Sequence, residues 1–426
     1  MMKSRSTIIA AIDIGSEKVT TLIANVQTEL TDLSKVINVI GVAASESGEG
    51  RGIKKGQIVN LEEAVDAVIE SVESAERMAG HNVTKAYLAL GGAHILSQNS
   101  HGVVAISNPE GEITQADINR VIDAASAVSL PPSRVLIHVI PKEFIVDGDS
   151  GIKDPLRMEG VRLEAEAHLI TASSSAVKNI EKVLDEVGIK VEEFIYSGIA
   201  SSDAVLTKTE KELGCVMIDI GAGTTSIAVY EEGSLTYSYV LPIGSRNVTK
   251  DLATGLRVSL EAAEKIKLSL NPLREKKGTE AEEYLDLTKY DAGEDKKVSR
   301  KTVLEGIIRP RLNEIFSMVK TQLEKEKLIN KIPSGAIITG GGAQVYGVEE
   351  SGKRLLSLPV RIGKPHGVEG LVDEILNTSF SVPIGVLINA SKKEPKDHLT
   401  SISKRLKLPT IGILAKLAKI FKDLLP

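Results

Sequence analysis

The feature that most constrains the fold of this 426-residue chain is a short motif that occurs twice, about half a chain length apart. The first copy is AIDIGS at residues 11–16, and the second is MIDIGAGTT at residues 217–225. Each copy has an apolar strand, an aspartate at the end of that strand, a glycine turn and a second apolar strand. A repeat at this distance indicates two domains of related fold.

The chemistry of such a turn suits a phosphate group. Glycine lets the backbone approach a ligand closely, and successive N–H groups of a turn form an anion-binding concavity. Two facing turns would therefore clamp a polyphosphate, while Asp13 and Asp219 hold Mg²⁺ through its waters. Thr224 and Thr225 would add hydroxyl donors, and Lys18 would add a positive charge. Either segment alone also fits an ordinary hairpin, but the pair favours nucleotide binding.

A third segment, IITGGGA at residues 337–343, supports the same prediction. A glycine triplet after a buried strand leaves an open backbone surface against which a nucleoside can lie. Taken alone the segment is weak evidence, because any loop after a strand can be rich in glycine. The chain has neither a Walker A sequence nor a GxGxxG motif after a strand, which excludes the two commonest phosphate-binding loops.

Composition narrows the class of protein. Apolar residues make up 42% and charged residues 26%, as in soluble globular proteins. The net charge of −5 predicts no general attraction to nucleic acid. The single cysteine, Cys215, excludes a disulfide within the chain and fits a reducing compartment. No uncharged apolar run approaches the ~20 residues that span a bilayer.

Hydrophobic periodicity predicts the elements around these motifs. Strands are expected at 7–14, 19–25, 84–91, 102–106, 135–140, 163–170 and 336–342, with a strand–turn–strand at 215–230. Helices are expected at 61–78, 115–128, 176–187, 248–255, 260–270 and 303–324. Thr114 and Gly188 are the expected caps of the second and third helices. The charged segment 272–300 is expected to be exposed loop or short edge structure.

The two Asp-x-Gly segments resemble the phosphate motifs of the actin, Hsp70 and sugar-kinase superfamily, and residues 339–343 resemble its adenosine motif. Residues 197–200 and 383–386 fall where that superfamily has its two connecting helices. Further segments are similar to the bacterial cell-division FtsA family: RGIKKG at 51–56, HVIP at 138–141, VDG at 146–148 and IKDP at 152–155.

The resemblance implies an α/β fold of the actin-like (ribonuclease H-like) kind, with two duplicated domains, an inserted α+β subdomain and a C-terminal amphipathic helix. Its expected parts are a domain 1 core at 1–85 and 168–212, the inserted subdomain at 86–167, a domain 2 core at 213–245 and 303–369, an outer subdomain at 246–302, a return to domain 1 at 370–390, a flexible linker at 391–409 and a membrane-targeting helix at 410–426.

The resemblance also implies ATP and Mg²⁺ as ligands. Asp13 and Asp219 would surround the metal. The phosphates would be held by Gly15, Ser16, Gly221, Gly223, Thr224 and Thr225, with Lys18 nearby. The nucleoside would be held by Glu264, Lys267, Gly340, Gly341 and Gly342. Glu264 and Lys267 lie one helical turn apart, so they also fit an ordinary surface ion pair.

Two positions depart from the superfamily's second phosphate motif, which usually has glycine at position 222 and aspartate at position 226. Here they are Ala222 and Ser226. The methyl group narrows the space beside the phosphates, and the serine removes a carboxylate. The segment 197–206 has no clear water-activating residue; Ser201, Ser202 and Asp203 are the candidates. We therefore expect ATP binding with weak or no ATPase activity.

The last residues form a separate amphipathic pattern. On a helical wheel one half is apolar, with Ile413, Leu414, Leu417, Ile420, Phe421, Leu424 and Leu425, and the other half carries Lys416, Lys419 and Lys422. Charges interrupt the apolar face, so such a helix lies in the interface of an anionic membrane and does not span it. The alternative is a helix that docks on the protein core or on a partner.

The family resemblance implies a polymer-forming adaptor that tethers FtsZ, the tubulin homologue of the division ring, to the inner face of the cytoplasmic membrane. Its partners would be FtsZ, other copies of itself, the membrane surface and further division proteins, and its location the division site. Two alternatives use the same nucleotide clamp: a sugar-kinase-like or Hsp70-like enzyme, and a PilM-like module of pilus assembly. The terminal helix favours the adaptor over both.

Overall fold

The structure is a computed structural model that describes residues 5–28, 35–46, 52–108, 110–271, 283–290, 297–371 and 375–393. The expected terminal helix at 410–426, and all of the expected linker from residue 394 onward, lie outside these ranges. Within them, no helix combines the length and the hydropathy needed to cross a membrane.

Two large sheets share one topology. The first has the order β11 (Lys190–Tyr196), β6 (Lys85–Leu90), β1 (Arg5–Ile14), β2 (Lys18–Thr28), β3 (Lys35–Glu46) and β19 (Glu369–Gly370). The second has the order β18 (Val360–Ile362), β17 (Ala336–Thr339), β12 (Cys215–Ile220), β13 (Thr225–Glu231) and β14 (Ser234–Leu241).

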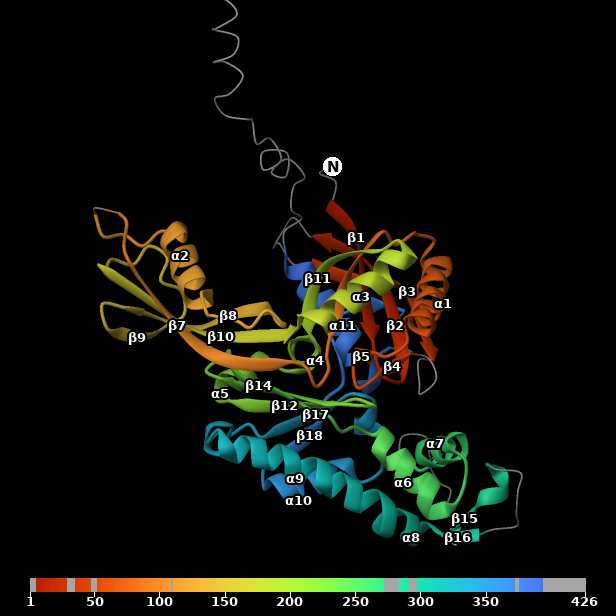
Figure 1. Cartoon of the computed structure of the whole chain (residues 1–426). Coiled ribbons are helices and arrows are strands. Elements are labelled where there is room, and N and C mark those ends of the chain that lie inside the picture. Colours follow the sequence, from red (N-terminus) through yellow and green to blue (C-terminus); the bar gives the residue numbers. More distant parts are fainter. Residues whose placement is uncertain are drawn as a thin grey trace, which may run out of the picture. The chain divides into compact units, whose positions relative to one another are not determined.

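Each sheet contains an antiparallel meander of three strands, and the strand that ends in the Asp-x-Gly turn pairs in parallel with a later strand. The expected duplication is therefore confirmed (Figure 1).

Helices cover these sheets because the strands alternate their apolar side chains between two faces. Cys215 and Met217 of β12 belong to the core shared with the first sheet, whereas Val216 and Ile218 belong to the core beneath the helices of the second. The first domain contributes α1 (Leu61–Ala79), α3 (Ser174–Val187), α4 (Ser197–Val205), α5 (Lys208–Leu213) and α11 (Ser381–Lys392). The second contributes α6 (Arg246–Leu256), α7 (Leu260–Ser269), α8 (Arg300–Val303), α9 (Arg309–Lys325) and α10 (Val348–Leu356).

The two expected connecting helices, α4 and α11, cross at a glycine. A Cβ at Gly385 would collide with the backbone carbonyl of Ala200, so only glycine allows this contact. Tyr196, the residue before α4, is fully buried, and its hydroxyl donates to the carbonyls of Ile227 and Tyr239 at 3.2 Å each. The end of β11 is thereby tied to the second sheet.

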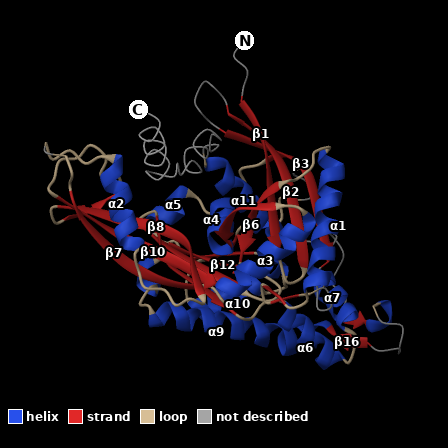
Figure 2. Ribbon diagram, turned by 45° about the horizontal axis from the view of Figure 1, so that its top comes forward, coloured by secondary structure: helices blue, strands red, loops and turns tan. Residues whose placement is uncertain are grey.

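The inserted unit is a four-stranded sheet in the order β7 (Leu96–Ala105), β10 (Arg162–Ser173), β8 (Arg134–Val146) and β9 (Asp149–Ile152), with α2 (Gln115–Ser126) packed on β7 and β10 (Figure 2). Thr114 caps α2 in a capping box with Asp117, and Gly188 ends α3 with a positive φ of 79°, both as expected. The expected start of this unit at residue 86 is corrected, because residues 85–90 form β6 in the large sheet.

Two smaller hairpins lie outside the large sheets. The pair β15 (Tyr284–Asp286) and β16 (Lys297–Ser299) is the short edge structure expected within 272–300. The pair β4 (Ile53–Lys54) and β5 (Gln57–Ile58) precedes α1. The single helix expected at 303–324 is instead α8, a π-helical turn at Leu304–Ile308, and α9.

Candidate functional site

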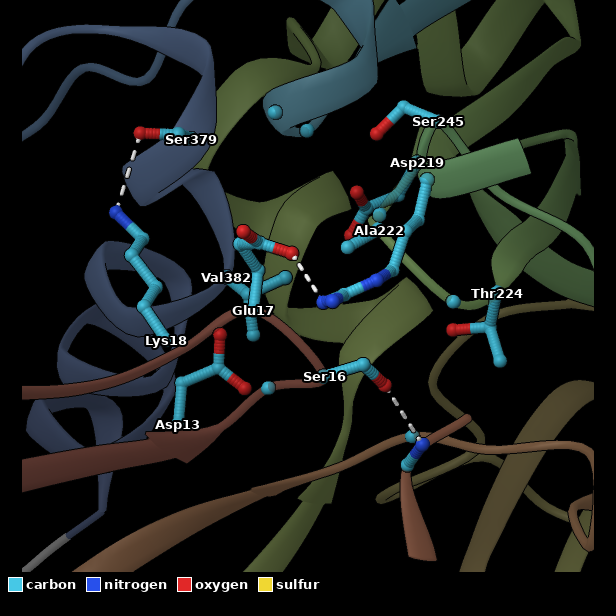
Figure 3. A pocket seen from close by; sticks show the side chains of 18 of the residues that line it. Asp13, Ser16, Glu17, Lys18, Asp219, Ala222, Thr224, Ser245, Ser379 and Val382 are labelled. Carbon is cyan, nitrogen blue, oxygen red and sulfur yellow. Dashed lines mark hydrogen bonds and ion pairs between the residues drawn. The ribbon is translucent and has the colours of Figure 1, made fainter. Parts of the chain in front are cut away.

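The two Asp-x-Gly turns have the same backbone geometry. In the first, the N–H of Gly15 donates to the carbonyl of Lys18 at 3.1 Å. In the second, the N–H of Gly221 donates to the carbonyl of Thr224 at 2.9 Å. Each turn therefore closes over the two residues between its ends, and the aspartate before each glycine faces the same space (Figure 3).

The turns are held against each other at close range. A Cβ at Gly223 would stand 2.8 Å from the hydroxyl of Ser16 and 3.1 Å from the Cα of Lys55, so a larger residue would push the two turns apart. The Ser16 hydroxyl accepts a hydrogen bond from the N–H of Gly56 at 3.0 Å. On the other side, the N–H groups of Ser245 and Arg246 donate to the carbonyls of residues 221 and 222, at 2.9 Å each.

Between the turns lies a cavity of about 320 Å³, which we call the hairpin cavity. Most of the predicted site residues line it, namely Asp13, Gly15, Ser16, Lys18, Asp219, Gly221, Gly223, Thr224, Glu264, Lys267, Gly340 and Gly341. The structure brings together residues from both halves of the sequence.

Two predicted residues do not line the hairpin cavity. Thr225 is fully buried in β13, and its hydroxyl donates to the carbonyl of Ile243 at 2.8 Å. Because neighbouring strand residues point to opposite faces, Thr224 and Thr225 cannot both face one ligand. Gly342 packs on Ile220, whose side chain would collide with any Cβ there. Gly342 is therefore needed for packing beneath the site.

Burial dominates the electrostatics of the two aspartates. It raises the pKa of Asp13 to about 6, an effect that the charge of Lys18 partly offsets. Burial and the negative charge of Asp13 raise the pKa of Asp219 to about 7, an effect that the nearby Ser201 hydroxyl partly offsets. Two facing carboxylates of this kind suit a hard divalent cation. The described residues hold no group of three or more His, Cys, Asp or Glu side chains, so water and phosphate oxygens would complete such a metal's shell.

Lys18 reaches the hairpin cavity but already has partners. Its ammonium donates to the hydroxyl of Ser379 at 3.2 Å and lies 3.7 Å from the centre of the Phe380 ring. Burial lowers the pKa of Lys18 to about 8, while the charge of Asp13 opposes that shift. Ser379 and Phe380, just before α11, therefore fix the position of the Lys18 ammonium. A phosphate in the cavity would bind to a lysine that is already held in place.

The other end of the hairpin cavity carries a buried polar cluster. Glu264 and Lys267 form an ion pair of 2.7 Å, and both contact the hydroxyl of Thr249, at 2.7 and 2.9 Å. The side chain of Lys267 is only 9% exposed. This pair is therefore not an ordinary surface ion pair. It lines the same cavity as Gly340 and Gly341, the glycines that follow β17.

Sequence reasoning missed several lining residues. The guanidinium of Arg246 forms an ion pair with Glu17 at 2.9 Å, which joins the first turn to α6 across the hairpin cavity (Figure 3). Other lining residues that we did not predict include Gly56, Gly91, Ser197, Ser245, Gln344 and Ser379. Gly56 and Ser197 had a signal, as parts of the RGIKKG segment and of the segment 197–200; the others become visible only when distant segments meet.

The candidates for water activation lie in α4, but they do not face the hairpin cavity as bases. The hydroxyls of Ser201 and Ser202 donate to backbone carbonyls of their own helix at 2.9 and 2.6 Å. Asp203 forms an ion pair with Lys211 at 2.9 Å. Among the described residues of α4, only Ser197 lines the cavity.

Comparisons with known proteins agree with this geometry. A family model described as the SHS2 domain inserted in FtsA matches residues 92–171, and a model described as cell division protein FtsA matches residues 216–385. The cell division protein FtsA of Borreliella burgdorferi is 36% identical over 94% of this chain and 95% of its own length.

Solved structures show the actin-like fold at low identity. The PilM–PilN type IV pilus biogenesis complex matches with a TM-score of 0.61 at 16% identity, over 91% of this chain and 99% of that one. MreB 5 of Spiroplasma citri, bound to AMPPNP, matches with a TM-score of 0.52 at 14% identity, over 90% of this chain and 96% of that one. The sequence identity extends over nearly the whole chain, and the inserted sheet lies in the region that matches the SHS2 domain of that family. This chain therefore belongs to the FtsA family of cell-division proteins.

Proposed function

We propose that this protein binds Mg·ATP in the hairpin cavity and acts as a polymer-forming membrane adaptor that tethers the FtsZ ring at the division site. The observation that carries the proposal is the pairing of two Asp-x-Gly turns of equal geometry around one cavity. A relative of the same fold, MreB 5, is bound to AMPPNP in its solved structure, which supports a nucleotide as the occupant.

Different lining residues would bind different parts of the nucleotide. Backbone N–H groups of the two turns, with the Ser16 and Thr224 hydroxyls, would bind phosphate oxygens. Asp13 and Asp219 would hold Mg²⁺, which neutralises charge on the phosphates when bound. Glu264, Lys267 and the glycines after β17 would hold the nucleoside.

We expect ATP to act mainly as an assembly ligand. The methyl of Ala222 lies at the cavity wall, and the α4 hydroxyls are bonded to their own backbone. A steady-state assay of the full-length protein without partners should therefore give turnover below the ordinary enzyme range of ~1–10³ s⁻¹. Turnover within that range would show that a base has been overlooked.

Membrane attachment rests on the sequence of the terminal segment, which lies outside the described residues. Full burial of one large apolar side chain stabilises by ~1.5–3 kcal/mol. An interfacial helix buries these side chains only partly and loses entropy on folding. One helix is then a reversible anchor. A polymer would place many helices on one surface, and avidity would make attachment firm.

Co-sedimentation with anionic vesicles, with and without Mg·ATP, tests the adaptor directly. We expect Mg·ATP to increase the bound fraction. Phe421→Glu places a charge within the apolar face and should release the protein, whereas the matched Lys419→Ala should only weaken binding and reduce its salt dependence. If both Phe421→Glu and a deletion of residues 410–426 bound vesicles like the parent, the terminal segment would not be the anchor.

A further inference from the structure

A second cavity, of about 270 Å³, adjoins the phosphate end of the hairpin cavity. The two share Ser16, Ala222, Gly223 and Arg246 in their walls. The remaining lining residues of the second cavity are Ile53, Lys54, Lys55, Asn247 and Lys250. We call it the basic cavity, because four of the described residues around it are cations and none is a carboxylate.

This concentration of positive charge stands out in a chain whose net charge is −5. Lys54 and Lys55 come from the hairpin between β4 and β5 in the first domain, and Arg246 and Lys250 come from α6 in the second. Arg246 is partly neutralised by Glu17, which lines only the hairpin cavity. Lys54, Lys55 and Lys250 are exposed, so an anion that enters the hollow from solvent meets positive charge from both domains.

The backbone of the lysine hairpin places Lys55 beside the second Asp-x-Gly hairpin. Lys55 and Gly56 form its two-residue turn with φ of 50° and 73°. Turns with both central residues at positive φ strongly favour Asn-Gly or Gly-Gly. A lysine in this conformation is strained, as are six other described non-glycine residues with positive φ, so the strain alone does not mark a site. Here the turn lies directly against Gly223 of the second Asp-x-Gly hairpin.

We propose that the basic cavity is a separate binding site for a phosphate-class oxyanion, next to the terminal phosphate of the nucleotide. Oxygens of such an anion accept charge-assisted hydrogen bonds from lysine and arginine side chains. An anion here attracts cations of both domains at once. Its binding therefore holds the two domains together beside the hairpin cavity and slows release of the nucleotide; this last effect rests on the nucleotide binding proposed above. By linkage, the nucleotide raises the affinity for the anion.

The first experiment measures binding of inorganic phosphate to the full-length protein by equilibrium dialysis, at constant ionic strength with chloride as the competing anion. It is done without nucleotide, with Mg·ADP and with Mg·AMPPNP. We expect saturable binding in all three states, and stronger binding with either nucleotide. Phosphate bound with Mg·ADP but excluded by Mg·AMPPNP would show that the cavity only seats the nucleotide's own terminal phosphate, which overturns a separate site.

Variants locate the binding. Lys54→Gln with Lys250→Gln removes one cation from each domain and should weaken phosphate binding by about tenfold or more. The matched control, Lys178→Gln with Lys190→Gln, removes two exposed lysines that line neither cavity and should leave phosphate binding within about twofold of the parent. Phosphate binding that survives in the first double variant, or that is absent from the parent in every state, overturns the proposal.

A second readout separates this proposal from the proposed function. Phosphate should slow dissociation of a fluorescent ADP several-fold in the parent and in the control, but not in the Lys54→Gln, Lys250→Gln variant. If the parent bound phosphate but no nucleotide, the Mg·ATP proposal would fail and the anion site would stand. If it bound nucleotide but no phosphate, only the anion site would fail.

Discussion

The two Asp-x-Gly hairpins share a backbone and differ in what they present. The first turn carries Ser16, Glu17 and Lys18, whereas the corresponding positions of the second hold Ala222, Gly223 and Thr224. The difference follows from contact, because a Cβ at Gly223 would press on the Ser16 side chain and on the Lys55 backbone of the first domain. The first hairpin contributes functional side chains, whereas the backbone of the second hairpin lies close against the first.

The strand that pairs in parallel with each hairpin shows the same asymmetry. Both β6 and β17 are followed directly by a glycine, Gly91 and Gly340. A Cβ at Gly91 would meet only the Ser197 side chain, at 2.8 Å from its hydroxyl. A Cβ at Gly340 would collide with the carboxylate of Asp219 and lie 2.5 Å from the carbonyl of Ile220, with φ at 85°. The second half is therefore the less tolerant of change.

The largest expected effect tests this difference in tolerance. Gly340→Ala forces both a collision and an unfavourable φ, so it should lower the free energy of unfolding by roughly 2–4 kcal/mol. The matched Gly91→Ala should cost less than about 1 kcal/mol, because the Ser197 side chain can rotate away. Urea denaturation of both variants without nucleotide provides the measurement. Equal losses would show that the two halves are equally constrained.

An exchange of side chains between the turns is the next test. Gly223→Glu should weaken ATP binding by more than about tenfold, because a side chain would separate the second turn from Ser16 and Lys55. Glu17→Gly at the corresponding position of the first turn should leave ATP affinity within a few-fold of the parent. The two affinities can be compared by fluorescence titration. If the glutamate at position 223 were harmless, the contact between the turns would not matter for binding.

The buried aspartates predict an unusual pH dependence for the protein without nucleotide or metal. Their raised pKa values mean that the folded state holds protons that the unfolded state releases, so stability falls as pH rises from about 4 to about 7. Asp219→Asn removes one of the two groups. At pH 8 the variant should be more stable than the parent by roughly 1–3 kcal/mol, and near pH 4 the difference should vanish.

Unfolding experiments from pH 4 to pH 8 test this sign. A variant that is less stable than the parent at pH 8 would mean that Asp219 has a favourable ionic partner in the folded protein.

The smallest expected effect concerns the ion pair across the hairpin cavity. Glu17 is 49% exposed, so its pair with Arg246 contributes only ~0.2–1 kcal/mol. Glu17→Gln should therefore speed nucleotide dissociation by no more than about fivefold, as a stopped-flow chase with unlabelled ATP would show. An increase of a hundredfold or more in the dissociation rate would show that this ion pair is a main determinant of nucleotide retention.

The sequence predicts the parts of the site that are local. The Asp-x-Gly turns, the glycines after β17 and the Glu264–Lys267 spacing are each visible within a few residues. The strand β3 has the alternating pattern of a half-buried strand, but no motif drew attention to it. The prediction that Thr225 contacts a phosphate was wrong, because the turn ends at Thr224 and β13 begins at Thr225. A motif does not show where the turn ends and the alternation of strand side chains begins.

The remaining contacts depend on segments far apart in the chain. Arg246 meets Glu17, and Lys18 meets Ser379, only because both sheets fold around the same connecting helices. The inserted sheet reaches β14 through His168, whose ring is bonded to Asn99 and Ser238 at 2.7 and 2.8 Å. Local periodicity contains no information about such pairs.

The central claim is that one nucleotide is clamped by both hairpins together, and titration of ATP in the presence of Mg²⁺ tests it most directly. The parent, Asp13→Ala and Asp219→Ala should be compared, with circular dichroism to establish that each variant is folded. We predict that each substitution weakens Mg·ATP binding by on the order of a hundredfold or more, because the metal and the phosphates need both carboxylates. Parent-like affinity in either folded variant would contradict the clamp and assign the nucleotide to one half alone.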